Sequence, residues 1–182
     1  SQSTDDEICE GEDCTFTVSA NGAGLSYQWQ KDGTNISGAT SSQYYLTNAT
    51  LSDAGDYSCD VSGDCGDNSS SLINLTVYES TTITAQPQNV EACEGDDHTF
   101  SVTASGENLT YQWQKDGSDI SGASASTYTV INIDSGDEGD YTCIVSGECG
   151  DETSQTASLT LVLTTEITTQ PNSATICEGD DH

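Results

Sequence analysis

Apolar and polar residues alternate in short runs along the chain, and this is the pattern of half-buried β-strands. The clearest runs are Thr99–Ala104, Leu109–Trp113, Tyr128–Ile133, Tyr141–Val145 and Ala157–Leu161. Turn signals separate them, such as Lys115-Asp-Gly117 and Gly147-Glu-Cys-Gly150. Helical periodicity is absent. About seven short strands with turns every 8–12 residues predict an all-β fold made of β-sandwiches.

The pattern repeats at an offset of 84 residues. Tyr27-Gln-Trp-Gln-Lys-Asp-Gly33 recurs as Tyr111-Gln-Trp-Gln-Lys-Asp-Gly117, and Cys9 recurs as Cys93 and Cys177. Such a period marks a tandem array in which each repeat is one structural unit. We expect repeat 1 over residues 1–79, repeat 2 over 80–163, and the first strand and turn of a third repeat over 164–182. The chain is therefore expected to be a segment of a longer array.

Charge excludes several classes of function. The 182 residues include 31 acidic and only 2 basic ones, for a formal net charge of −29. Binding to nucleic acid or to anionic lipid needs clusters of Lys and Arg, so neither is expected. No apolar run is long enough to insert into a membrane, and no signal peptide is visible. Eight cysteines in such a chain indicate an extracellular protein with disulfides.

The order of several motifs resembles an immunoglobulin-like domain. It runs Cys93-Glu-Gly, Trp113, Lys115-Asp-Gly117 and then Asp137-Glu-Gly-Asp-Tyr-Thr-Cys143. The resemblance implies that Trp29 and Trp113 are core residues, and that Tyr57 and Tyr141 form the tyrosine corner before the strand F cysteine. Gln86-Pro87 is assigned to the first strand.

The amino-acid sequence of the repeats is also similar to that of immunoglobulin-like repeats in large bacterial (Bacteroidetes-type) surface adhesins and gliding filaments. That resemblance implies adhesion or fibre building at the cell surface. Catalysis is not expected, because the two histidines, His98 and His182, occupy equivalent turn positions where repeat 1 carries Cys14. A catalytic base is improbable at such a position.

The cysteines depart from the immunoglobulin pattern. The strand B position is Val18 in repeat 1 and Val102 in repeat 2, so the usual core disulfide cannot form. Cys59 and Cys143 are then expected as buried thiols that pack against tryptophan.

The remaining cysteines are disulfide candidates. The fold places Cys93 at the lower pole of a sandwich and Cys149 at the upper pole, roughly 20–25 Å apart at ~3.3 Å per residue. A bridge between the two poles of one domain is therefore not expected. We favour Cys9 with Cys149, which would join the two repeats. Cys93 and Cys177 would pair with later repeats and Cys65 with an earlier one, while a local Cys9–Cys14 bridge competes with this scheme. Two ligands at such a turn do not make a zinc site.

Acidic residues gather at turns near the poles, and stacked repeats would bring them together. Calcium suits such oxygen-rich sites, so junctional Ca²⁺ is one interpretation, and a solvated acidic surface is the other. The candidate calcium ligands are Glu94, Asp96, Asp97, Asp137, Glu138, Asp140, Glu148 and Asp151.

The sequence thus predicts a structural segment of a long surface adhesin or filament shaft. Its partners would be neighbouring repeats and, in a fibre, other copies. The alternative is a multivalent module whose loops bind glycan or protein. The region Thr40–Tyr45, against Ser124–Tyr128 in repeat 2, varies between repeats and is the best candidate for a contact surface.

Overall fold

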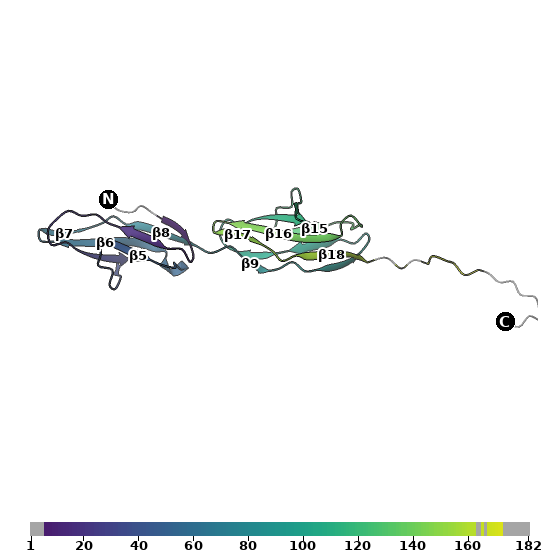
Figure 1. Cartoon of the computed structure of the whole chain (residues 1–182), viewed down its shortest axis with the longest axis horizontal. Helices are drawn as coiled ribbons and strands as arrows, with labels where there is room; N and C mark the ends of the chain where they lie inside the picture. Colours follow the sequence, from purple (N-terminus) through teal and green to yellow (C-terminus); the bar gives the residue numbers. More distant parts are fainter. Residues whose placement is uncertain (1–5, 163–164, 166, 173–182) are drawn as a thin grey trace, which may run out of the picture.

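The computed structural model describes residues 6–162, 165 and 167–172, and these form two β-sandwiches placed end to end (Figure 1). Each sandwich has its own core of buried side chains. One core extends from Ile8 to Val77 and the other from Ile83 to Leu159. The two cores coincide with the two 84-residue repeats, and the long axis of the molecule runs through both of them.

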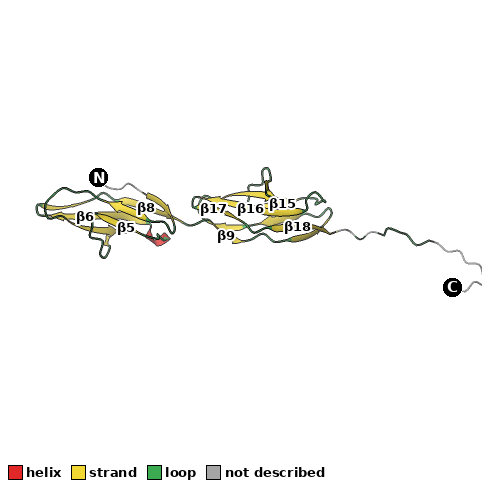
Figure 2. Cartoon of the chain, in the orientation of Figure 1, coloured by secondary structure: helices red, strands yellow, loops and turns green. Residues whose placement is uncertain are grey.

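Over residues 6–79, repeat 1 contains eight strands and one short 3₁₀ helix (Figure 2). They are β1 (Asp6–Cys9), β2 (Cys14–Thr17), β3 (Ser26–Lys31), β4 (Thr34–Asn35), β5 (Gln43–Leu46), η1 (Leu51–Asp53), β6 (Gly55–Gly63), β7 (Gly66–Ser69) and β8 (Ile73–Tyr78).

Repeat 2 follows the same order and has two additional strands near its start. Its strands are β9 (Thr82–Ala85), β10 (Val90–Cys93), β11 (His98–Ser101), β12 (Thr103–Ser105), β13 (Thr110–Lys115), β14 (Ser118–Asp119), β15 (Thr127–Val130), β16 (Gly139–Gly147), β17 (Gly150–Thr153) and β18 (Ala157–Val162).

The sheets of the two repeats have the same topology. In repeat 1 the larger sheet has the order β1-β8-β6-β3-β4, with β7 also paired to β6, and β2 pairs with β5 in the opposing layer. In repeat 2 the larger sheet is β10-β18-β16-β13-β14 with β17 on β16, opposed by β11-β15 and β12-β9. The pairs β1–β8 and β10–β18 are parallel and the other pairs are antiparallel.

The alternating pattern of the strands builds the core. Trp113 on β13 is fully buried and lies opposite Cys143 on β16 in the strand register. Its indole N–H donates to the carbonyl of Ala125 at 3.0 Å, so the one polar atom of the ring has a partner. Trp29 and Cys59 form the same arrangement in repeat 1, and both cysteines are free thiols with no exposed surface.

A tyrosine corner closes each sandwich at the lower pole. The hydroxyl of Tyr57 donates to the carbonyl of Asp53 at 2.8 Å, and Tyr141 donates to the carbonyl of Asp137 at 2.9 Å. Phe16 stacks on the Tyr57 ring with the ring centroids 4.4 Å apart. This contact joins the two layers of the sandwich, because Phe16 lies on β2 and Tyr57 on β6.

Two strand predictions differ from the structure. The run Tyr128–Ile133 forms a strand only to Val130, because Asn132 has a left-handed backbone with φ of 55° and Ile131 is 72% exposed. Gln86-Pro87 does not belong to the first strand of repeat 2, since β9 ends at Ala85.

Removing the hydroxyl of Tyr57 tests the tyrosine corner. We expect Tyr57→Phe to lower the free energy of unfolding by about 1–2 kcal/mol, because the partly buried carbonyl of Asp53 loses its donor. Urea denaturation gives this value. The control is Tyr45→Phe, whose side chain is 62% exposed, and its expected change is within about 0.5 kcal/mol. Equal effects of the two substitutions would contradict the assignment.

The buried thiol and phenol groups of the core also predict a loss of stability at high pH. Burial raises the pKa of Cys143 from 9.0 to about 11 and, together with the charge of Asp137, raises the pKa of Tyr141 from 10.0 to about 12. The folded chain therefore keeps protons that the unfolded chain releases. Stability should fall as pH rises from about 9 towards 12.

Thermal unfolding followed by tryptophan fluorescence at increasing pH checks this prediction. The melting temperature should fall less steeply with pH in Cys143→Ala, because this substitution removes one of the buried ionisable groups. A melting temperature that stays constant over that pH range would show that burial does not perturb these groups.

Candidate functional site

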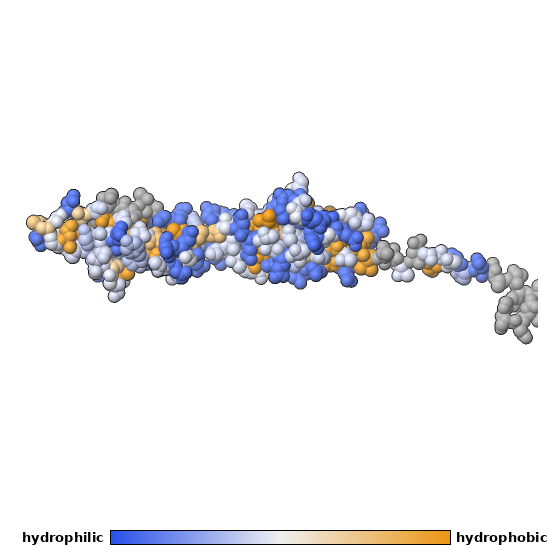
Figure 3. Space-filling model, viewed as in Figure 1, coloured by the Kyte–Doolittle hydropathy of each residue, from blue (hydrophilic) through white to orange (hydrophobic). Residues whose placement is uncertain are grey.

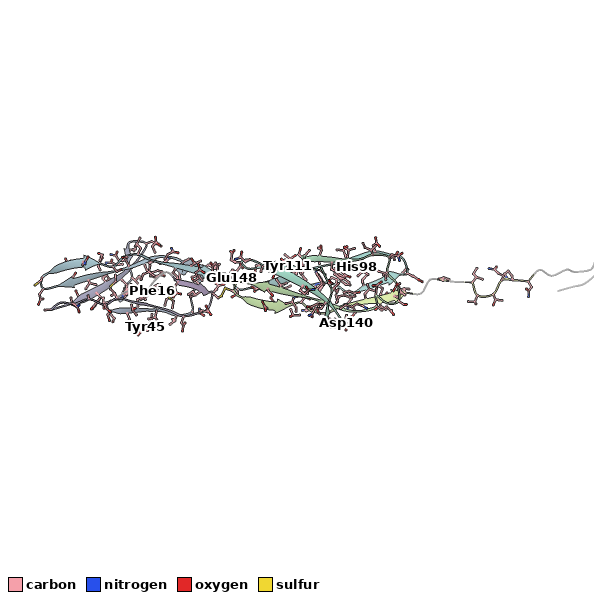
Figure 4. All side chains as sticks on the ribbon, turned by 90° about the horizontal axis from the view of Figure 1, so that it is seen from above. Phe16, Tyr45, His98, Tyr111, Asp140 and Glu148 are labelled. Carbon is pink, nitrogen blue, oxygen red and sulfur yellow. A yellow bond between two sulfur atoms is a disulfide. The ribbon has the colours of Figure 1, made fainter. Side chains whose placement is uncertain are left out.

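The two repeats are joined by a disulfide between Cys9 and Cys149. The two Cα atoms are 5.6 Å apart, within the range of an ordinary disulfide, and the residues are 140 positions apart in the sequence. Cys9 is the last residue of β1, and Cys149 lies in the turn between β16 and β17. This is the pairing that the sequence analysis favoured. Figure 4 shows the yellow S–S bond at the contact between the repeats, beside Glu148.

The peptide connection between the repeats lies next to this disulfide. Residues 79–81 separate β8 from β9, and the N–H of Thr81 donates to the carbonyl of Cys149 at 3.4 Å. The carbonyl of Tyr78 lies 3.8 Å from the Cys149 sulfur. We call Cys9, residues 78–81 and Cys149 the junction. Two covalent connections thus cross the boundary between repeats at nearly the same place.

Thr81 is half-buried and packs against two glycines of repeat 2. A side chain on Gly147 would come within 2.4 Å of the Thr81 hydroxyl oxygen, and one on Gly106 within 3.2 Å of its Cα. The absence of side chains at these two positions therefore lets the connection lie close to the upper pole. The hydroxyl of Thr81 is buried without a hydrogen-bond partner among the described residues.

Beyond Thr81 the connection becomes the first strand of repeat 2. Ile83 on β9 is buried in the core, and its neighbours on β9 pair with β12 through Thr103↔Ala85 and Ser105↔Thr82. The N–H of Ile83 donates to the carboxylate of Glu152 on β17. The sequence analysis missed this strand. The signal that could have found it is the recurrence of Ile83 as Ile167 at the 84-residue offset.

Carboxylates surround the junction. Burial, followed by the charges of Glu7, Glu148 and Glu107, raises the pKa of Tyr78, because a phenolate there would be poorly solvated and repelled. The junction is therefore negatively charged on both sides, and the disulfide joins the repeats against that repulsion.

The other cysteines fall into two groups. Cys14 was a disulfide candidate, and that prediction is wrong: its side chain is buried from β2, and its thiol donates to Asp6 at 3.2 Å. Burial raises the pKa of Cys14 to about 12. Cys65 and Cys93 are free and exposed. They lie at the outer ends of the two repeats, so no bond between them can form within the chain. Cys177 is outside the described residues.

The acidic candidates for calcium do not form a common site. Among the described residues, no three His, Cys, Asp or Glu side chains gather in a way that could bind a metal ion. Five of the eight candidates instead accept hydrogen bonds from other residues of repeat 2. Asp96 accepts from the N–H of Cys93, Asp97 from Asn132, Asp137 from Asp134 and Glu138 from Leu161, while Asp140 accepts from the Ser158 hydroxyl. Glu94, Glu148 and Asp151 lie on turn or strand positions at the poles.

The proposed contact surface lies on the side of the sandwich. Tyr45 on β5 is 62% exposed and its hydroxyl donates to the side chain of Gln43. Tyr44 points inward and stacks near Tyr57, with ring centroids 6.2 Å apart. His98 packs edge-on against Phe100, and burial lowers its pKa. His98 is thus part of the packing between β11 and the core.

Two family models described as immunoglobulin domains match the chain, one over residues 1–77 and one over residues 82–147. Within the described residues there is no helix of the length and apolarity that crossing a membrane requires.

Relatives among characterised proteins are multi-domain animal proteins. The muscle M-line assembly protein unc-89 of Caenorhabditis elegans is 29% identical over 177 residues, which cover 86% of this chain and 2% of that protein. Hemolin of Manduca sexta is 28% identical over 172 residues, which cover 84% of this chain and 42% of hemolin. Roundabout homolog 1 of Homo sapiens is 24% identical over 163 residues, which cover 83% of this chain and 10% of that protein. The chain spans less than half the length of each. These relatives give no support to the resemblance with bacterial surface repeats.

Solved structures share the arrangement of two sandwiches. The I-band fragment I67–I69 of titin aligns with a TM-score of 0.70 and 22% identity, covering 88% of this chain and 63% of that one. The insect immune protein hemolin aligns with a TM-score of 0.62 and 18% identity, covering 89% and 46%. Each repeat thus matches a model of the immunoglobulin domain, over residues 1–77 and 82–147, and the chain has the fold of two such domains in tandem.

Proposed function

We propose that the chain is a structural segment of an extended extracellular array, a shaft in which immunoglobulin domains are kept in line. The observation that carries this proposal is the Cys9–Cys149 disulfide, which adds a second covalent connection beside the peptide linker. With two connections, rotation about one flexible linker no longer changes the angle between the domains freely. A shaft needs this property, whereas a flexible tether does not.

The surface is consistent with a shaft that stays extended. The net charge of −29 makes the domains repel one another, which opposes folding back and lateral association. Figure 3 shows a surface that is largely blue and white, with small separate orange areas. No catalytic role is proposed, since the proteins similar to this chain include a muscle M-line assembly protein and hemolin, whose structure is linked to homophilic adhesion.

An extracellular location is part of the proposal. A disulfide between two domains persists in an oxidising compartment. The match to extracellular domains 3–5 of Drosophila OTK, at a TM-score of 0.65, concerns the fold alone and is compatible with it. A bacterial or an animal cell surface would place the same mechanical requirement on the array.

A second candidate function is a multivalent binding module. The exposed Tyr45 beside Gln43 supports it, because an exposed aromatic ring with a polar tip suits recognition of glycan or protein. The shaft remains the preferred proposal, since the counterpart in repeat 2 is Thr129 and the surface is therefore not repeated.

Removing the junction disulfide tests the shaft. The double variant Cys9→Ser/Cys149→Ser should show a broader distribution of angles between the domains and a shorter mean maximum dimension. Small-angle X-ray scattering and negative-stain microscopy of the full chain measure both quantities. Each domain keeps its own core, so both should stay folded.

The matched control is Cys65→Ser/Cys93→Ser, which also removes two cysteines and leaves the junction disulfide intact. Its dimensions should equal those of the unmodified chain. If the Cys9→Ser/Cys149→Ser variant is as extended and as narrowly distributed as this control, the disulfide does not keep the domains in line, and the proposal fails.

Junctional calcium and a solvated acidic surface are the two interpretations of the acidic turns, and melting curves distinguish them. Because several of the candidate carboxylates already accept hydrogen bonds from backbone N–H groups, we expect calcium and magnesium to raise the melting temperature equally at constant ionic strength, by screening repulsion. A rise specific to calcium, lost with chelator, would support junctional Ca²⁺ instead.

A further inference from the structure

Five asparagines of the chain stand in the pattern Asn-X-Ser/Thr, which is the acceptor motif of N-linked glycosylation. They are Asn35, Asn48, Asn68, Asn74 and Asn108. The motif is short, and serine and threonine are abundant in this chain, so the motif alone does not identify a modified residue. The surroundings of the five side chains separate them into two groups.

Three of the asparagines lie on strands and use their side chains within the fold. The side-chain carbonyl of Asn35 on β4 accepts from Gln30 at 2.8 Å, and that of Asn68 on β7 accepts from the next backbone N–H at 2.9 Å. The amide of Asn74 on β8 donates to Asp56 at 2.9 Å. A sugar on these residues would be attached to side chains that hydrogen bonds already hold in place.

Asn48 and Asn108 form the second group, because both lie in exposed turns between strands. Each has a left-handed backbone, with φ of 52° and 54°. Within the part of the chain that the structure describes, neither side chain forms a hydrogen bond. A bulky substituent on the amide nitrogen of either residue therefore displaces no hydrogen bond of the fold.

The turn of Asn48 adjoins the junction from the side of repeat 1. Its backbone N–H donates to the carboxylate of Asp13 at 2.8 Å. The carbonyl of the next residue, Ala49, accepts from the N–H of Gly11 at 2.7 Å. These contacts bind the turn to the residues that directly follow Cys9, so Asn48 lies at the pole of repeat 1 that faces repeat 2.

Asn108 occupies the facing pole of repeat 2. The carbonyl of its neighbour Glu107 accepts from the N–H of Glu148 at 3.0 Å, and Glu148 directly precedes Cys149. Figure 4 shows Glu148 beside the S–S bond. The two asparagines with unengaged side chains thus flank the junction, one in each repeat.

The equivalent turns at the other two poles lack the motif. Asn132 has the same backbone as Asn48, with φ of 55°, but Asp134 stands where the motif needs a hydroxyl. Gly24 takes the place of Asn108, with φ of 66°. A left-handed turn favours asparagine or glycine, so the fold explains these residue types without requiring a complete motif. Of these four turn positions, only the two that meet at the junction carry it.

The junction is partly open to solvent. Cys9 and Cys149 are half-buried, and Glu79 in the connection is exposed. Reduction of a disulfide requires a thiolate to reach one of the two sulfurs, so its rate depends on access. A bulky hydrophilic substituent on each side restricts that access, and it adds no positive charge that the surrounding carboxylates would bind.

We propose that Asn48 and Asn108 carry N-linked glycans and that these glycans shield the junction disulfide from reductants. This inference rests on the extracellular location within the proposed function, because the transfer takes place at secretory membranes. The donor is an oligosaccharide linked to a lipid pyrophosphate. The side-chain nitrogen of asparagine forms a bond to the anomeric carbon, the bond from that carbon to the pyrophosphate breaks, the lipid pyrophosphate leaves, and the amide releases one proton to solvent.

Site occupancy is the first test. The full chain is secreted from cultured insect cells and treated with peptide N-glycosidase in heavy-oxygen water, which converts each modified asparagine into a labelled aspartate that mass mapping locates. Asn48 and Asn108 should be modified in most molecules. Asn48→Gln and Asn108→Gln should each lower the mass of the secreted chain by one glycan. An unmodified residue at either position would overturn the inference.

Shielding is tested by the rate at which reduced glutathione opens the junction disulfide, measured by alkylation and mass mapping. We expect the double variant Asn48→Gln/Asn108→Gln to be reduced about two to five times faster than the parent, because access to the sulfurs is less restricted. The matched control is Asp134→Thr, which completes the motif at Asn132 on the pole of repeat 2 that lies away from the junction. It should gain a glycan and keep the rate of the parent.

Equal rates of reduction in the parent and the double variant would also overturn the inference. Mass mapping of the Cys9–Cys149 peptide pair in the same samples separates this failure from that of the proposed function. If that disulfide is present while the two asparagines are unmodified or the rates are equal, the shaft stands and the shielding falls. If that disulfide is absent from the secreted chain, both fall, because there is no bond to shield.

Discussion

The strand that completes repeat 2 comes from the connection to repeat 1, and this constraint orders much of the structure around it. Ile83 is buried in the core of repeat 2, and Thr81, two residues earlier, packs against Gly106 and Gly147. The connection therefore cannot swing away without opening the core. In many tandem arrays a linker only sets the reach between domains. Here the same residues belong to the fold of the second domain, so folding and orientation are coupled.

The disulfide acts on top of this packing and against electrostatics. Each domain is strongly acidic, and the junction brings carboxylates of both domains near Tyr78. The chain has two cations, and both are used inside the domains: Lys31 donates to the carbonyl of Ser52 at 2.7 Å and Lys115 to that of Gly136 at 2.6 Å. They stabilise the turn before the tyrosine corner and leave the junction without positive charge of its own. The disulfide, and not ion pairs between the domains, therefore holds the two domains together at the junction.

The sequence is informative about this fold because each repeat carries a complete set of motifs. Trp113, Tyr141 and Cys143 identify the strands β13 and β16, and their recurrence in repeat 1 means that each assignment is supported by two examples. The Cys9–Cys149 pairing could also be argued from the poles of a sandwich. The entry strand β9 is hard to predict because Thr82-Ile83-Thr84-Ala85 offers only Ile83 and the small Ala85 to a period-two pattern, and the burial of Ile83 depends on its contacts with β12 and β17. Charge density alone suggests calcium at the acidic turns, and composition does not reveal the hydrogen bonds that five of the eight candidate carboxylates accept.

The junction disulfide also determines how the segment responds to mechanical tension. Cys9 and Cys149 are 140 positions apart in the chain, and their Cα atoms are 5.6 Å apart. A fully extended peptide of that length would span about 480 Å at roughly 3.4 Å per residue. Tension applied to the two ends of the chain passes from one sulfur to the other and bypasses nearly all of both domains. Even if a sandwich unfolds under load, the length stored between these cysteines is not released, so the segment resists stretching independently of the stability of its domains.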